Sequence, residues 1–268
     1  MKVILAPVDF SEISTNALSF AAEICKRANA RLIVVNILQN DELKEEAKAS
    51  IERLGGFLNN TFGGLTFELK ITEGDLIHSI KDLVSDLKPD MIVMGTKGAS
   101  GLKRILIGSN TVNVLSNVKV PVLVIPETAR FERFLNKNKN RVVLATDLDE
   151  LEDDDALDIL KEIALLMVEP KVRILNIRPK DTQLDFQKSM ERSAILSRFS
   201  PEIDSERATV FSATIIGGIN YYLNEHVDTG LLSMIARDTG HLIQKHYTHE
   251  MASHTHLPLL VLHDAAND

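Results

Sequence analysis

The segment Lys2-Val3-Ile4-Leu5-Ala6-Pro7-Val8-Asp9 decides the fold, because it is an apolar run that ends abruptly on a carboxylate. A continuous run of this kind is typical of a parallel strand that is buried on both faces. It returns in the second half as Arg141-Val142-Val143-Leu144-Ala145-Thr146-Asp147, which we align with it as a copy one residue shorter. Val120-Pro121-Val122-Leu123-Val124-Ile125 likewise returns, at nearly the same offset, as Leu257-Pro258-Leu259-Leu260-Val261-Leu262. Matching ends at matching offsets predict a duplicated domain.

Between these ends, strand-length apolar runs alternate with stretches in which apolar residues recur every three or four positions. In the first half we expect strands at 3–6, 32–38, 67–71, 91–94 and 120–125. A helix capped by Ser11 and helices over 43–54, 76–87 and 112–118 separate them, and Gly55-Gly56 is expected to end or bend the second helix. In the second half, strands are expected at 172–177, 208–213 and 231–236, with helices over 181–199 and 216–227. The alternation predicts an α/β fold of two doubly wound, five-stranded parallel-sheet domains.

The polar stretch 127–140 is rich in Asn and Lys and is the expected linker. It places the first domain at 1–135 and the second at 136–268. The chain of 268 residues is 44% hydrophobic and 25% charged, which excludes a disordered chain or a disulfide scaffold. The single cysteine, Cys25, falls at an apolar position of a helical pattern and is expected to be a buried structural thiol.

The charge is unevenly distributed along the chain. Acidic and basic residues balance in 1–135, so the whole net charge of −8 lies in 136–268. An acidic chain is a poor partner for duplex DNA or an anionic membrane. No apolar run approaches the length of a membrane span, and the amino-terminal run is too short for a signal peptide. We therefore expect a cytoplasmic protein with no nucleic-acid and no membrane partner.

A glycine-rich stretch follows the fourth expected strand and leads into a helix: Gly95-Thr96-Lys97-Gly98-Ala99-Ser100-Gly101-Leu102-Lys103-Arg104-Ile105-Leu106-Ile107-Gly108-Ser109-Asn110-Thr111. Ligands of open α/β sheets bind at the carboxyl ends of strands, where glycines let backbone N–H groups approach an anion. The stretch lacks the P-loop spacing, and a flexible surface loop is the alternative. Asp9, at the same edge of the sheet, is suited to accept from ribose hydroxyls or, alternatively, to support the helix start at Ser11.

Taken together, Gly95-x2-Gly98-x9-Gly108-Ser109 and Pro7-Val8-Asp9-Phe10-Ser11 resemble the ATP-binding branch of the universal stress protein family. The duplicated chain resembles the tandem type of that family. The resemblance implies a Rossmann-like strand order 3-2-1-4-5 and ATP or a related adenine nucleotide, with Mg²⁺ on its phosphates, at the strand ends. It implies contacts to adenosine from Pro7, Val8 and Asp9, to adenine from Ile37, to ribose from Met94 and Gly95, and to phosphates from Gly98, Gly108, Ser109, Asn110 and Thr111.

The second half departs from this pattern. Ala236-Arg237-Asp238-Thr239-Gly240-His241 stands where the glycines are expected, and Lys245-His246 stands near the expected Gly-Ser pair. Only Asp147 is retained. Side chains would block the approach of a phosphate, and Asp238 would repel it, so we expect no ATP in this half.

The resemblance implies a nucleotide-dependent stress-response regulator without catalytic residues. A slow ATPase, for which Asp75 and His78 are the nearest titratable groups, and a nucleotide-free interaction scaffold are the alternatives. Family members commonly dimerise through the last strand, so 120–125 and 257–262 are expected to pair as an intramolecular pseudo-dimer, and further homo-oligomers stay open. The five histidines within 241–256 are expected to be scattered on the surface, so no metal ligands are assigned.

Overall fold

The chain divides into two units, Met1–Phe131 and Glu132–Asp268. The computed structural model describes residues 1–39, 44–96, 109–134, 136–151, 155–180, 182–237, 248, 251 and 256–264. The boundary falls slightly before residue 135. The expected linker is not wholly irregular, because it holds the short helix α5 (Phe131–Phe134) and a 3-10 turn, η2 (Lys137–Lys139).

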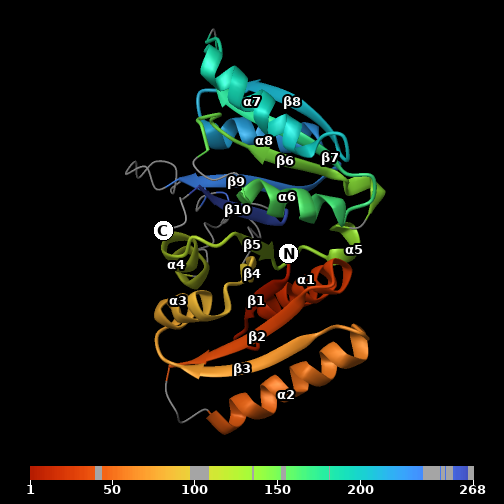
Figure 1. Ribbon diagram of the computed structural model, residues 1–268, viewed down its shortest axis with the longest axis vertical. Coiled ribbons are helices and arrows are strands. Elements are labelled where there is room, and N and C mark those ends of the chain that lie inside the picture. Colours follow the sequence, from red (N-terminus) through yellow and green to blue (C-terminus); the bar gives the residue numbers. More distant parts are fainter. Residues whose placement is uncertain are drawn as a thin grey trace. The chain divides into compact units, whose positions relative to one another are not determined.

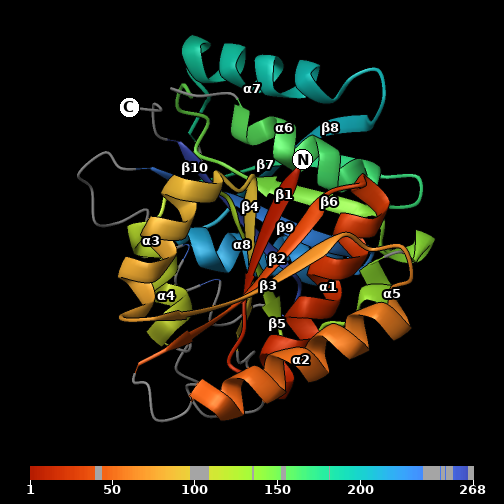
Figure 2. The same cartoon turned by 60° about the horizontal axis from the view of Figure 1, so that its bottom comes forward.

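The first unit alternates strictly between strands and helices, as expected. Its five strands are all parallel, in the order β3-β2-β1-β4-β5 (Figure 1). The helices α1 and α2 lie on one side of the strands and α3 and α4 on the other (Figure 2). The elements are β1 (Val3–Pro7), α1 (Glu12–Ala28), β2 (Arg31–Leu38), α2 (Lys44–Thr61), β3 (Phe67–Glu73), α3 (Leu76–Leu87), β4 (Met91–Thr96), α4 (Ser109–Asn117) and β5 (Val122–Pro126).

The helix α1 shows why helices of this chain can be predicted from the sequence. Ser11 caps it by accepting from the Ser14 backbone N–H, and Asn29 ends it in the left-handed conformation at φ 52°. The apolar face of α1 is buried, including Cys25, and burial raises the pKa of that thiol to about 12. The expectation of a buried structural thiol is confirmed.

The helix α2 excludes one of the two alternatives for the Gly55-Gly56 pair, because it does not end there but continues to Thr61. A Cβ atom at Gly55 would lie 2.9 Å from Leu69 Cδ1. The glycine therefore permits a close approach of α2 to β3 rather than a helix end.

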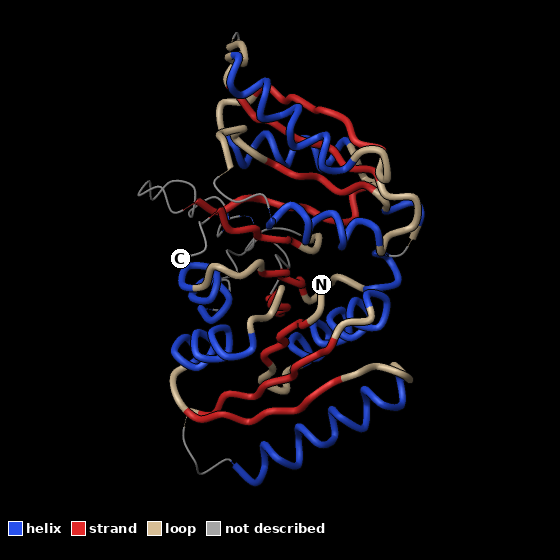
Figure 3. Tube along the Cα trace, in the orientation of Figure 1, coloured by secondary structure: helices blue, strands red, loops and turns tan. Residues whose placement is uncertain are grey.

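The second unit repeats the architecture. Its strands are parallel in the order β8-β7-β6-β9-β10, so both units have the order 3-2-1-4-5 (Figure 1). Figure 3 shows helices packed beside the strands in this unit, as in the first. The helix expected over 181–199 starts only at Phe186, because Asp185 is its N-cap. The elements are β6 (Arg141–Ala145), α6 (Asp155–Leu165), β7 (Lys171–Arg178), α7 (Phe186–Phe199), β8 (Asp204–Phe211), α8 (Ile215–Glu225), β9 (Thr229–Arg237) and β10 (Leu259–Asp264).

Backbone hydrogen bonds align the two units and correct the alignment made from the sequence. Arg31 N–H donates to Lys2 O at 2.8 Å, and Lys171 N–H donates to Asn140 O at 2.9 Å. Lys2 therefore corresponds to Asn140 and not to Arg141, and no residue is missing from the second copy. A one-residue slip would exchange the two faces of a strand. Two apolar runs match almost equally well in either register, so the sequence alone did not decide the alignment of the two copies.

A buried asparagine confirms this register in each unit. Asn36 Nδ2 donates to Val8 O at 2.8 Å, and Asn176 Nδ2 donates to Thr146 O at 3.0 Å. Val8 therefore corresponds to Thr146, and the aspartate that follows each one occupies the same place in its unit. Among the described residues, no helix has both the length and the apolar character needed to cross a lipid bilayer.

Candidate functional site

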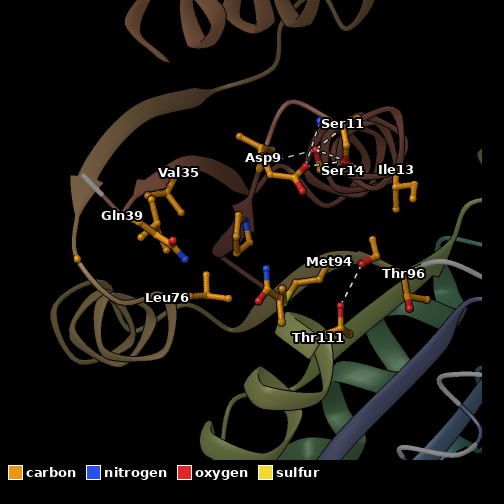
Figure 4. Close-up of a pocket in the computed structure, with 16 residues that line it drawn as sticks. Asp9, Ser11, Ile13, Ser14, Val35, Gln39, Leu76, Met94, Thr96 and Thr111 are labelled. Carbon is orange, nitrogen blue, oxygen red and sulfur yellow. Dashed lines mark hydrogen bonds between the residues drawn. The ribbon is translucent and has the colours of Figure 1, made fainter. Parts of the chain in front are cut away.

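A cavity of about 510 Å³ opens at the carboxyl ends of β1, β2 and β4 in the first unit (Figure 4). This volume falls in the range of about 300–1,000 Å³ that is typical of small-molecule sites. Predicted site residues form much of its lining: Pro7, Val8, Asp9, Ile37, Met94, Gly95, Asn110 and Thr111. Gly98 and Gly108 lie outside the described residues, and only the backbone of Ser109, at the start of α4, is described.

Sequence reasoning missed the other lining residues, which are Ser11, Ile13, Ser14, Val35, Gln39, Gly74, Leu76 and Thr96. Val35 and Ile37 alternate along β2 and so share one face of the strand, a signal that the sequence already carried. Gly74 and Leu76, at the junction of β3 and α3, carried no such signal. They reach the cavity because the chain crosses from β3 past β2 and β1 to β4.

Asp9 is held by the first turn of α1. Its Oδ1 accepts from Ser11 N–H at 3.0 Å and from Ser11 Oγ at 2.6 Å, while its own N–H donates to Ser14 Oγ at 3.4 Å. Burial alone would raise the pKa of Asp9, but the hydrogen bonds from Ser11 and Ser14 outweigh it and leave the pKa below its ordinary value. The carboxylate is therefore ionised at neutral pH. It supports the cap residue Ser11, as one interpretation of Asp9 predicted, and it also lines the cavity. Its contact with ribose stays a prediction.

The backbone next to this aspartate adopts an uncommon conformation. Phe10 has φ 63°, and Leu148, which follows the corresponding Asp147, has φ 62°. Bulky residues rarely occupy the left-handed region, and such strain is often retained near functional sites. The duplicated units therefore share the turn that places the carboxylate.

Gly95 lets three elements meet closely at the end of β4. A Cβ atom at this position would lie 2.7 Å from both the Cγ2 and the carbonyl oxygen of Ile13 on α1. On the other side, Thr111 Oγ1 of α4 donates to Gly95 O at 3.1 Å. Only a residue without a side chain fits here.

The corresponding position in the second unit is not a glycine. Ile92 N–H donates to Pro121 O at 2.9 Å and Leu232 N–H donates to Pro258 O at 3.1 Å, so Ile92 corresponds to Leu232. Counting along both strands places Ile235 where the first unit has Gly95. The cavity here measures about 80 Å³ and is lined by Ala145, Thr146, Asp147, Ile177, Ile215, Ile219, Met234 and Ile235.

Arg237, at the end of β9, also lies at the carboxyl edge of the second unit's sheet. Arg237, with a side chain only 6% exposed, pairs with Asp264 at 3.2 Å and with Asp147 at 3.5 Å. It also donates to the carbonyl oxygens of Glu150 at 2.7 Å and Asp149 at 2.5 Å. The carboxylate that corresponds to Asp9 thus faces an internal cation.

The two titratable groups considered for hydrolysis do not line the first cavity. Asp75 caps α3 by accepting from Ile77 N–H at 2.9 Å and His78 N–H at 3.1 Å. His78 is exposed and lies 3.6 Å from Asp82. Within the described ranges, no three His, Cys, Asp or Glu side chains gather as a metal site. Of the histidines in 241–256, only His256 belongs to those ranges.

Each unit is thus a doubly wound α/β domain, and the first carries a ligand-sized cavity at the carboxyl edge of its sheet, as ligand-binding proteins of this fold do. The sequence model of the universal stress protein family matches residues 1–126. A putative universal stress protein of Staphylococcus haemolyticus is 30% identical over 138 residues, which cover 46% of this chain and 84% of that protein. The chain belongs to the universal stress protein family.

One further relative and one solved structure are similar to this chain. A universal stress protein of Methanocaldococcus jannaschii is 29% identical over 140 residues, which cover 46% of this chain and 81% of that protein. The crystal structure of a universal stress protein from Archaeoglobus fulgidus superposes with a TM-score of 0.73, covers 98% of both chains and is 20% identical. This last likeness concerns the fold, and it extends over both units.

Proposed function

We propose that the first unit binds an adenine nucleotide, ATP or a related compound, and that occupancy regulates the contacts of this stress protein with a partner. The observation that carries the proposal is the 510 Å³ cavity at the strand ends, with its apolar and polar walls. Apolar side chains of Val35, Ile37, Leu76 and Met94 line it and suit a flat purine ring.

The polar groups of the cavity suit the rest of a nucleotide. Asp9, ionised and fixed by Ser11, is placed to accept from ribose hydroxyls. The start of α4 reaches the cavity through Asn110 and Thr111, and the first N–H groups of a helix lack partners within the helix and favour phosphate oxygens. Thr96 Oγ1, also on the lining, is buried and has no hydrogen-bond partner among the described residues. It is a polar atom that a ligand or a water would satisfy.

The donor set fits magnesium that arrives with the nucleotide. Mg²⁺ is usually held by one or two carboxylates together with substrate phosphates. Asp9 is the one acidic residue of the described lining. When bound, the ion would neutralise phosphate charge, and Asp9 is the side chain that would face it.

Binding is favoured over rapid hydrolysis. Efficient phosphoryl transfer to water needs a group that positions or deprotonates the water. Asp9 is the only titratable residue of the described lining, and its lowered pKa makes it a weak base. We also propose that the second unit does not bind the nucleotide, because Ile235 and the Arg237 network occupy the corresponding space.

A pair of matched substitutions tests the site. Ile37 on β2 and Ile177 on β7 occupy corresponding positions and are both half-buried. We expect Ile37→Glu to abolish ATP binding by the full chain in calorimetry, because it places a carboxylate against the apolar face of the purine ring, and Ile177→Glu to leave it unchanged. Circular dichroism shows whether both variants remain folded. The reverse pattern would place the site in the second unit, and no binding by the unmodified chain would favour a scaffold.

Two further measurements separate the remaining alternatives. Steady-state phosphate release faster than about one turnover per minute would favour an ATPase over a binding module. Hydrogen exchange with and without ATP maps the surface that occupancy changes. If protection is confined to the cavity lining, the protein binds a nucleotide without the proposed regulation.

A further inference from the structure

The second unit carries a cluster of three arginines that the proposed function does not use. Arg178 ends β7, Arg207 lies on β8 and Arg192 lies on α7, the helix that packs on these two strands. Arg192 lies on the same face of α7 as the buried residues Ile195 and Phe199. The cluster is thus built where α7 meets the sheet.

The strand register places two of these arginines on one face of the sheet. The neighbour of Arg178 on β8 is Phe211, and the Arg178 guanidinium carbon lies 5.1 Å from the centroid of that ring. On β8, Arg207 and Phe211 are separated by an even number of positions, so their side chains lie on the same face of the sheet. The adjacent Ile177 contacts Gly218 of α8, so Arg178 points to the opposite side of the sheet, toward α7.

The charges of the cluster are close together. The pKa of Arg192 lies below its ordinary value, first because of burial and then because of the nearby positive charges of Arg207 and Arg178. Arg178 Nε and Nη1 are buried and have no hydrogen-bond partner within the part of the chain that is described. The β8 carboxylates Asp204 and Glu206 are directed instead to Arg173, at 3.4 and 3.2 Å.

The first unit shows that the fold does not require these charges. With the register above, Arg178 corresponds to Leu38 and Arg207 to Leu69. Leu69 packs closely against α2 in the first unit, near Gly55. In the second unit, guanidinium groups therefore stand where the first unit has apolar side chains, within the half of the chain that carries the whole net charge of −8.

We propose that Arg178, Arg192 and Arg207 form a binding site for a phosphate-type oxyanion on the second unit. Arg207 is exposed, and Arg178 and Arg192 are half-buried, so an anion reaches the cluster from the surface. Guanidinium groups donate in pairs to phosphate oxygens. A phosphoryl group offers enough oxygens for three converging arginines, whereas one carboxylate offers two. The anion supplies negative charge that Asp204 and Glu206 of β8 do not supply, because they pair with Arg173.

Arginine side-chain NMR of the full chain locates the site. The probe is inorganic pyrophosphate, and the arginine Nε–Hε signals are assigned from the signal that each Arg→Lys variant loses. We expect the signals of Arg178, Arg192 and Arg207 to shift with one common Kd, and that of Arg198 to stay in place. Arg198 is the matched control because it lies on the same helix and pairs with Asp158 at 3.6 Å. Uniform shifts of all arginine signals, or no shifts, would overturn the proposal.

Thermal denaturation provides a second readout, and comparing Arg192→Met with the unmodified chain separates the second unit from any phosphate that the first unit binds. Pyrophosphate should raise the Tm of the unmodified chain. For Arg192→Met, the same rise in Tm should need a pyrophosphate concentration at least about tenfold higher. In anion-free buffer Arg192→Met should be no less stable than the unmodified chain, because it removes a repulsion. Arg198→Met should keep the full response. A response that survives Arg192→Met, or an equal response to succinate, contradicts a phosphate-type site.

Discussion

Gly95 offers the sharpest test of how the first unit makes room for a ligand. A Cβ atom there would lie 2.7 Å from the Ile13 carbonyl oxygen and from Ile13 Cγ2. Ordinary contacts between such atoms are about 3.5–4.0 Å, so α1 and β4 would have to separate by roughly 0.8 Å. Overpacking of this kind typically costs about 1–3 kcal/mol. We therefore expect Gly95→Ala to lower the free energy of unfolding by that amount.

Gly95→Ile adds a second effect, because it recreates the situation of Ile235 in the other unit. The corresponding cavity there measures about 80 Å³, against about 510 Å³ here. We expect Gly95→Ile to weaken ATP binding by at least about 100-fold, or roughly 2.7 kcal/mol. Gly95→Ala should weaken it by about tenfold or less, since a methyl group displaces less of the ligand.

Calorimetry with ATP and urea denaturation measure the two effects separately. Gly56→Ala is the control, because a Cβ atom at Gly56 meets nothing within 4 Å and alanine should stabilise α2 by about 0.5–1 kcal/mol. A folded Gly95→Ile variant that binds ATP as tightly as the unmodified chain would refute the reasoning that an absent side chain creates the cavity.

Three further predictions concern the stability of the units. Arg237→Met should cost about 3–5 kcal/mol in urea, because it leaves the carboxylate of Asp264, only 3% exposed, without its guanidinium, and the further change Asp264→Leu should restore most of that loss. Asn36→Ala should cost about 1–3 kcal/mol, because the carbonyl that follows β1 loses its buried donor; a loss under about 0.5 kcal/mol would show that water replaces it. For Asp228, burial raises the pKa, but the bidentate bonds from Arg141 at 2.9 Å lower it below its ordinary value. The stabilisation is therefore present above the unfolded pKa of about 4 and is lost as pH falls through the folded pKa, so Asp228→Asn should cost roughly 1–2 kcal/mol at pH 7 and little at pH 3.

The sequence predicted the elements and the duplication well, because both depend on local patterns. Apolar runs that end in polar residues mark buried strands, and the spacing of apolar residues marks helix faces. The start of α1 was readable from Ser11, and the strand-end position of Asp9 and Gly95 followed from the alternation alone. The strand order came from a family resemblance, since periodicity says nothing about which strands are neighbours.

The errors of the sequence interpretation have a common physical cause. The alignment of Lys2 with Arg141 was wrong because either register buries apolar side chains, and only hydrogen bonds between strands distinguish them. The Gly55-Gly56 pair suggested a helix end or a bend because glycine is a poor helix former. The helix end was wrong, and it is the close approach of Gly55 to Leu69 on a distant strand that requires glycine there.

By itself, then, the sequence determined two α/β domains and the strand ends at which a ligand is expected, because hydrophobic periodicity is a local property of the chain. Only the tertiary structure decided that Ile235 stands in the place of Gly95, that Leu76 and Thr96 join the first cavity, and that Arg178 and Arg207 share the face of the sheet on which α7 packs. These features arise where segments far apart in the chain pack against one another, and their register is set by hydrogen bonds and side-chain volume that no single segment encodes.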